Sequence, residues 1–330
     1  MKHKTILTGL TGCILITATA MAQPNVSSRY DFMKLEYPGS VFSYPLGIND
    51  RREIAGVYAD ATMALRGFLW KEGRFTKIDF PGALGTGPGG INNRGDIAGT
   101  YFGRDGFQHG FLRARPAWCE DDDDQACAPV FTTIDDPAAV QTQGIPFEFG
   151  PGLGTAAIGI NNHGVMTGMY APGVYSDGFI RSHAGAFTPV DHPSASHFPG
   201  FGTKCFAVAD TGVAACDYLT LENGVTPISH GFLLDDGHFV SIEVPGSIQA
   251  GFGTQVNGVN DHRMAVGIFS SLTGGHGLLW VSGNYFTVDY AGKPFSELHS
   301  INDRGDLTGA YSDDPLGRVL HGFVAFPKDR

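Results

Sequence analysis

The sequence predicts an all-β fold, a six-bladed β-propeller closed by an N-terminal strand in the last blade. One motif of twelve residues occurs six times along the chain, and each copy is followed by a Gly-Phe-Leu-like segment. The last copy lacks a final segment that is found instead near the N-terminus. Repeats of about 40–50 residues are typical of four-stranded propeller blades.

The motif has the pattern of a β-hairpin. Its first two copies, Gly47–Tyr58 and Gly90–Tyr101, place a turn that begins Asn-Asx between two apolar segments. Such a turn between strand-like segments predicts two paired strands. The other copies are Gly159–Tyr170, Ala207–Tyr218, Gly258–Phe269 and Ser300–Tyr311. The Gly-Phe-Leu-like segment is then the third strand of each unit, and an aromatic-led segment ending in an acid is the fourth.

The two ends of the chain supply complementary parts of one blade. The sixth unit stops after Phe323–Phe326 and has no fourth strand. Residues Phe32–Gly39 align with the fourth-strand segment Phe75–Gly82 of the first unit. We therefore expect Tyr30–Tyr37 to complete the last blade, which would close the ring and remove exposed sheet edges.

Residues 1–22 have the pattern of a signal peptide. A basic start and an apolar run over residues 5–19 precede a small-x-small cleavage site that ends at Ala22. Leu10–Cys13 offers an alternative, a lipoprotein cleavage box that leaves a lipidated Cys13, but the apolar run continues past it. We expect secretion to the periplasm or the extracellular space, with residues 23–330 as a single propeller domain. No later segment approaches the roughly 20 apolar residues of a membrane helix.

The net charge excludes some classes of binding partner, and the cysteines predict disulfides. The formal charge of −11 argues against nucleic acid and anionic membranes. We expect a monomer with an unknown extracellular ligand, a polysaccharide or a protein, and no pattern indicates a cofactor or a metal ion. Counting back from the fourth motif turn sets Cys205 opposite Cys216, which predicts a cross-strand disulfide in an exported protein. Cys119 and Cys127 would close a loop in the same way, with a cysteine-ligated zinc ion as the weaker alternative.

Two insertions lengthen the units. Residues 116–130 contain the acidic run Glu120–Asp124, which is typical of a solvated loop, with Ca²⁺ binding as the alternative. Residues 136–155 are rich in glycine and proline. Neither insertion is long enough to form a domain.

The repeat resembles a known family. Gly-Ile-Asn-Asn-x-Gly-x-Ile-x-Gly-x-Tyr, then His-Gly-Phe-Leu and Phe-x-x-Ile-Asp-x-Pro-Gly, is similar to the bacterial extracellular HAF-type repeat and covers nearly all of the chain after residue 22. The copy from Ala207 departs most, with Ala209 at the asparagine and Cys216 at the second glycine. The resemblance implies export and a repeat β architecture, and it implies no activity for particular residues.

Residue types that recur from unit to unit are expected to serve blade geometry. The recurring histidines precede Gly-Phe-Leu, the acids end the fourth strand, and a hydroxyl lies six residues before each motif anchor. They are His109, His230, His276 and His321; Glu36, Asp79, Asp135, Asp191, Glu243 and Asp289; Ser43, Thr86, Thr155, Thr203, Thr254 and Ser296. We expect structural histidines, acids that cap the following Pro-Gly turn and hydroxyls that stabilise a turn, rather than metal ligands, catalytic carboxylates or a ring of donors.

The tips of the motif turns carry charged or titratable side chains, and we expect these tips on the face opposite the mouth of the central channel. They are Arg51, Arg94, His163, His262 and Arg304. Exposed turn tips tolerate such residues, and a basic ring for an anionic partner is the alternative.

A functional site should lie where the copies differ. The fourth unit departs most, and the segment that leads into it contains our site candidates His192, His197 and Lys204, joined by Tyr218. Further members are Glu148 and Phe149 from the long loop, and Asp136 and His299 from the corresponding connections. Histidine and lysine could act as base and charge neutraliser, yet no nucleophile–base spacing accompanies them.

We therefore expect a binding or cell-surface interaction protein, and the sequence leaves open whether the chain is an enzyme. The alternative is an extracellular propeller enzyme, a polysaccharide lyase or hydrolase, with its site at the channel mouth. Gathering of the three candidates at the channel mouth would favour the enzyme, and scatter along the rim would favour the binding protein.

Overall fold

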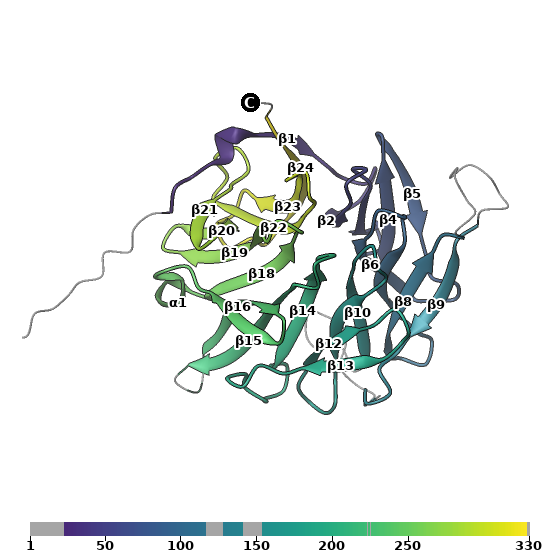
Figure 1. The fold of residues 1–330 in the computed structure, drawn as a ribbon. Coiled ribbons are helices and arrows are strands. Elements are labelled where there is room, and N and C mark those ends of the chain that lie inside the picture. Colours follow the sequence, from purple (N-terminus) through teal and green to yellow (C-terminus); the bar gives the residue numbers. More distant parts are fainter. Residues whose placement is uncertain (1–22, 117–127, 141–153, 223, 225, 329–330) are drawn as a thin grey trace, which may run out of the picture.

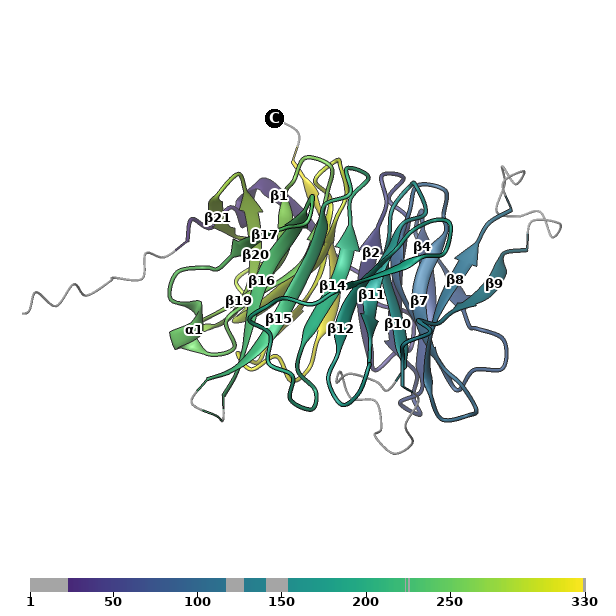
Figure 2. The ribbon, with the colours of Figure 1, turned by 60° about the horizontal axis from the view of Figure 1, so that its bottom comes forward.

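Six antiparallel four-stranded sheets form a ring in the computed structural model, which describes residues 23–116, 128–140, 154–222, 224 and 226–328 (Figure 1). The six-bladed propeller predicted from the repeats is confirmed. Figures 1 and 2 show the first strand of each blade closest to the axis and the fourth at the rim. Residues 1–22, Cys119, Cys127, the acidic run 120–124, Glu148 and Phe149 lie outside the described residues.

Each blade uses the strands that the repeat predicts. The first three blades are β2 (Phe42–Ile48), β3 (Ile54–Ala59), β4 (Leu65–Lys71) and β5 (Arg74–Ile78); β6 (Gly85–Ile91), β7 (Ile97–Phe102), β8 (Gln108–Ala114) and β9 (Val130–Ile134); β10 (Thr155–Ile160), β11 (Met166–Tyr170), β12 (Asp177–Arg181) and β13 (Phe187–Val190). The next two are β14 (Thr203–Val208), β15 (Ala214–Glu222), β16 (Thr226–Asp235) and β17 (His238–Ile242); β18 (Thr254–Val259), β19 (Ala265–Ser271), β20 (Gly274–Val281) and β21 (Asn284–Thr287). The described residues also include the short helix η1 (Ser27–Arg29), which precedes the first strand, and the short helix α1 (Ser247–Ala250), which lies between β17 and β18. Among the described residues, no helix has the length and apolar character needed to cross a membrane.

The sixth blade contains both ends of the chain. It consists of β22 (Phe295–Ile301), β23 (Leu307–Ser312), β24 (His321–Pro327) and the N-terminal β1 (Tyr30–Lys34). β1 pairs antiparallel with β24, with Met33 opposite Val324, which confirms the predicted closure. The segment before β1 also reaches the fifth blade, because the N–H of Val26 donates to the carbonyl of Thr287 in β21 at 2.9 Å. The ring is therefore closed across two blades.

The repeated glycine and phenylalanine form the contacts between sheets. The phenylalanine of the third strand is fully buried in five blades, as Phe68, Phe111, Phe179, Phe232 and Phe323. The second motif glycine lies opposite it, as Gly168 does opposite Phe179. A Cβ at Gly168 would collide with the carbonyl oxygen of Ala156 and with the ring of Phe179. The motif glycine is thus required by close packing rather than by turn geometry.

Every innermost strand also contains a β-bulge just before the motif turn. In β14 the bulge is at Phe206, and Val208 lies opposite Ala214 rather than Val213 as simple counting predicts. The bulge compensates for this one-residue shift, so Cys205 still lies opposite Cys216. The two form the predicted disulfide. A bulge also changes the direction of the side chain of the extra residue. Several of these side chains line the central channel.

Candidate functional site

The repeated hydroxyls are structural. All six are buried, and each accepts a hydrogen bond from the backbone N–H of the residue that follows the strand-ending acid. The N–H of Phe80, for example, donates to Thr86 Oγ1 at 2.9 Å. None of the six lines the channel cavity described below. The interpretation as turn-stabilising groups is confirmed.

The strand-ending acids have a different partner from the expected one. Because the hydroxyl already accepts the N–H of the turn, four of the acids bind the histidine of their own blade instead. The pairs, each through Nδ1 at 2.6–3.0 Å, are His109–Asp135, His230–Glu243, His276–Asp289 and His321–Glu36. The predicted turn cap is therefore wrong, whereas the structural role of the histidines is confirmed.

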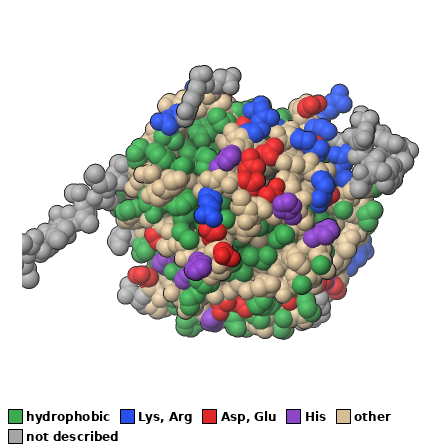
Figure 3. Space-filling model, viewed as in Figure 1, with side chains coloured by type: hydrophobic (Ala, Val, Ile, Leu, Met, Phe, Trp, Pro, Cys, Tyr) green, Lys and Arg blue, Asp and Glu red, His purple; other side chains and the backbone are tan. Residues whose placement is uncertain are grey.

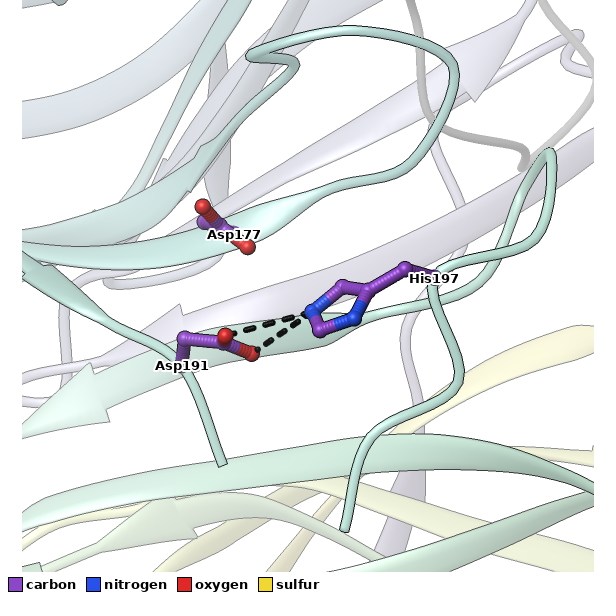
Figure 4. Close-up of side chains that lie close together, drawn as sticks. All are labelled: Asp177, Asp191 and His197. Atoms are coloured by element: carbon purple, nitrogen blue, oxygen red, sulfur yellow. Dashed lines mark hydrogen bonds and ion pairs between the residues drawn. The ribbon is translucent and has the colours of Figure 1, made fainter. Parts of the chain in front are cut away.

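The third blade lacks this pair. Asp177 occupies the position of the histidine, opposite the motif residue Tyr170. The strand-ending acid of the same blade, Asp191, is approached by His197 from the following loop, with His197 Nε2 3.2 Å from Asp191 Oδ2 (Figure 4). His197, predicted as part of a site, thus lies beside two carboxylates.

The other two candidates have separate surroundings. The ring of His192 stacks on Tyr218 at 3.9 Å between ring centroids, as Phe80 stacks on Tyr101 in another blade. Burial, followed by the charge of His230, lowers the pKa of His192. Lys204 lies in β14 opposite the buried Asp217. Burial raises the pKa of Asp217, and the charge of Lys204 opposes that rise. Within the described residues, His192, His197 and Lys204 therefore have different neighbours, namely Tyr218, Asp191 and Asp217 respectively.

A cavity of about 390 Å³ occupies the central channel, and none of the three candidates lines it. Tyr44, Asn257, Glu297 and His299 line it with polar groups. Leu46, Ile158 and Phe206 supply apolar surface. Leu46, Ile158, Phe206, Asn257 and His299 are the residues at the bulges of their strands. The bulges therefore supply much of the wall, with a different residue type in nearly every blade.

His299 is held firmly in this wall. It was expected on a connection between strands, but it lies in β22. Its Nδ1 is 2.9 Å from the carbonyl oxygen of Pro45, and its Nε2 is 3.1 Å from Glu297 Oε1. The imidazole also stacks on the ring of Tyr44. Burial and the nearby charge of Glu297 raise the pKa of Tyr44, so its hydroxyl remains protonated at neutral pH.

One end of the cavity is formed by a closed ring of motif-turn residues. Each backbone N–H in the ring donates to a side-chain oxygen of the next member. The members, in order, are Asp50, Asn93, Asn162, Asp210, Asp261 and Asp303. Burial, and then the carboxylates of Asp261 and Asp50, raise the pKa of Asp303. Four of the six members are acids. The face seen in Figure 3 carries acidic side chains close to its middle, with Lys, Arg and His side chains around them.

The arginines at the turn tips are paired with acids. Arg51 contacts Glu53 at 2.7 Å and Arg94 contacts Asp96 at 2.8 Å, and both acids are buried. These arginines therefore neutralise buried carboxylates, which explains their presence without an anionic partner.

Comparison with known proteins gives matches to solved structures only. No protein-family model and no curated protein matches the chain. A triple arginine mutant of AofleA from Arthrobotrys oligospora is 11% identical, with a TM-score of 0.50 and coverage of 90% of this chain and 86% of that one. A mutant of the Aleuria aurantia lectin in complex with Fucα1-6GlcNAc is 11% identical, with a TM-score of 0.45 and coverage of 87% and 97%.

TolB from Acinetobacter baumannii is 12% identical, with a TM-score of 0.47 and coverage of 74% of this chain. The match covers 53% of that protein, so this chain spans about half of TolB. At these identities the likeness extends to the fold alone, and the chain is a six-bladed β-propeller.

Proposed function

We propose that this protein is a secreted, monomeric binding protein that holds a neutral sugar of an extracellular glycan in its central channel. The observation that carries the proposal is the cavity of about 390 Å³. Ligand pockets have volumes of roughly 300–1,000 Å³ and combine apolar walls with a few polar groups. This cavity has both kinds of wall.

The polar groups suit a ligand rich in hydroxyl groups. Asn257, Glu297 and His299 come from two neighbouring blades, and Tyr44 adds a protonated phenol. Phe206 and Ile158 offer apolar surface for the C–H groups of a sugar ring. No lysine or arginine is among the described residues that line the cavity, and Glu297 adds negative charge. An anionic ligand would therefore be repelled.

Two further observations support export. The pattern of residues 1–22 is that of a signal peptide. The Cys205–Cys216 disulfide suits an oxidising compartment. The resemblance to the HAF-type repeat, which implies export, fits the same location.

The test is a screen of the full chain against an array of neutral and acidic glycans, followed by titration calorimetry with the ligand found. His299→Ala and Glu297→Gln should each weaken binding at least tenfold, because both residues line the cavity. His192→Ala is the matched control, since His192 lies in an aromatic stack outside it. Melting temperatures of all variants establish that they are folded.

Three results would overturn the proposal: no binding to any glycan, a preference for acidic glycans, or unchanged affinity in both channel variants. Cleavage of the bound glycan would favour the alternative, a polysaccharide lyase or hydrolase.

A further inference from the structure

The third blade differs from the others at one position of the repeat. Opposite the motif aromatic residue, four blades carry a histidine and the first carries Arg66. The third carries Asp177, opposite Tyr170. A side chain that donates hydrogen bonds is thus replaced by a carboxylate beside the strand-ending acid.

This replacement brings two carboxylates and one imidazole together. One ligand atom from each of Asp177, Asp191 and His197 lies within 4.8 Å of the others (Figure 4). Asp177 Oδ1 is buried and has no hydrogen-bond partner among the described residues. At the repeat position where the other blades carry histidine or arginine, this blade therefore has a second carboxylate, and its imidazole comes from the loop residue His197 instead.

We propose that Asp177, Asp191 and His197 bind one divalent transition-metal ion, for which zinc is the best match. Imidazole nitrogen and carboxylate oxygen are both zinc ligands, and zinc sites of three protein ligands keep a fourth position open. Ca²⁺ prefers six to eight oxygen ligands, which this set does not supply. The proposal concerns a site outside the channel, and it does not depend on the sugar-binding proposal.

Two hydroxyl groups orient the carboxylates. Tyr170 Oη donates to Asp177 Oδ2 at 3.4 Å, and Thr203 Oγ1 donates to Asp191 Oδ1 at 3.4 Å. Hydrogen bonds of this kind fix the orientation of metal ligands and are a regular part of metal sites. Both donors come from the scaffold strands, so the two carboxylates are held before an ion arrives.

The site is open to solvent on one side. The side chains of His197 and Asp191 are 46% and 41% exposed. The large apolar side chains of Phe198 and Val174 are also exposed beside it. A bound ion would therefore keep a position for water or for a donor atom of a ligand that lies on this apolar border.

The second blade provides an internal comparison. Asp105, His109 and Asp135 are the same three residue types, but they are arranged differently. Asp135 binds His109 Nδ1 at 2.8 Å, whereas Asp105 binds His109 Nε2 at 3.0 Å. The two carboxylates lie on opposite sides of the ring, so their oxygens do not converge on one point. Residue types alone would predict two sites, and the geometry points to one.

The experiment is calorimetric titration of Zn²⁺ into the full chain, prepared without a histidine tag and freed of metal with a chelator. We expect one saturable site with micromolar affinity and a rise in melting temperature with Zn²⁺, since an ion that binds only the folded state stabilises it. Asp177→Asn and His197→Gln should each weaken binding at least tenfold. Asp105→Asn, the matched control in the second blade, should bind as the wild type does.

A second readout is the visible spectrum of the Co²⁺-loaded protein, which reports ligand number and should change in His197→Gln. Absence of a saturable site, or affinity that survives either Asp177→Asn or His197→Gln unchanged, would overturn the proposal. Saturable Ca²⁺ binding without Zn²⁺ binding would also overturn it, because the imidazole would then not be a ligand.

Discussion

His321 Nδ1 lies 2.6 Å from Oε1 of Glu36, so the last strand of the chain is joined to the N-terminal segment by a side-chain hydrogen bond as well as by β pairing. These residues are 285 positions apart in sequence. In other blades the equivalent pair is local, such as His276 with Asp289. The same contact thus serves blade geometry in one place and ring closure in another.

Deletion of residues 30–39 should open the ring. The deletion removes β1, which exposes the edge of β24, and exposed sheet edges pair with other chains. We expect concentration-dependent aggregation, measured by light scattering, and a lower melting temperature. Glu36→Gln is the control, because it keeps the strand and should stay monomeric. A deletion variant that is monomeric with an unchanged melting temperature would contradict closure by β1.

Most of the fold could be predicted from the repeat. Strand order, the closing strand and the disulfide follow from one motif and its copies, because each blade repeats the same hydrogen-bond pattern. The positions of the β-bulges could not be predicted in this way. A hairpin counted without a bulge places Val213 opposite Val208, whereas Ala214 lies there. The side chains at the bulges, including Asn257 and His299, therefore could not be assigned to the channel from counting.

The site was harder to predict than the fold for a related reason. Asp177 was recognisable as a departure from the repeated histidine, but its approach to His197 depends on how the loop after β13 returns. His192 looked functional because it is titratable. Its position is the one where other blades carry Phe80 or Tyr290, and its ring fills the same stack. Comparing aligned positions across the copies would have revealed this.

Asn at position 209 should stabilise the protein. Motif asparagines donate from Nδ2 to the backbone carbonyl of the next blade, as Asn302 does to Asn49 at 2.9 Å. Ala209 cannot donate, so Ala209→Asn should add a bond toward Asn260 and raise the free energy of unfolding by about 1 kcal/mol. Asn302→Ala should have the opposite effect, by about 1–3 kcal/mol, because buried partners are left unpaired. Urea denaturation measures both, and a destabilised Ala209→Asn variant would contradict this role of the ring.

Stability should depend on pH through His109. Burial lowers the pKa of this imidazole, but its bonds to Asp135 and Asp105 raise it by more, so the folded value lies above the ordinary 6.5. The protonated ring therefore stabilises the fold fully below pH 6.5, and that contribution is lost as the pH rises through the folded pKa. We expect His109→Gln to lower the melting temperature more at pH 6 than at pH 8.5. An equal loss at both values would contradict the charge-assisted pair.

Removal of the Cys205–Cys216 disulfide should lower stability without changing the fold. The cysteines are 11 positions apart, and closing a loop of that size contributes about 2–3 kcal/mol against the unfolded chain. The double change Cys205→Ala with Cys216→Gly restores the residues that the third blade has there, Ala157 and Gly168. We expect this variant to lose about 2–3 kcal/mol of unfolding free energy in oxidising buffer, measured by urea denaturation.

A reducing buffer supplies the control for this prediction. Reduction opens the bond in the wild type, so the two proteins should then differ little in unfolding free energy. Alkylation of unreduced wild type should leave both Cys205 and Cys216 unmodified in peptide maps, because their sulfurs are bonded and both residues are buried. A label on either cysteine before reduction would contradict the pairing in the fourth blade. Equal stability of the wild type and the double variant in oxidising buffer would show that the bond does not offset the lost motif asparagine at Ala209.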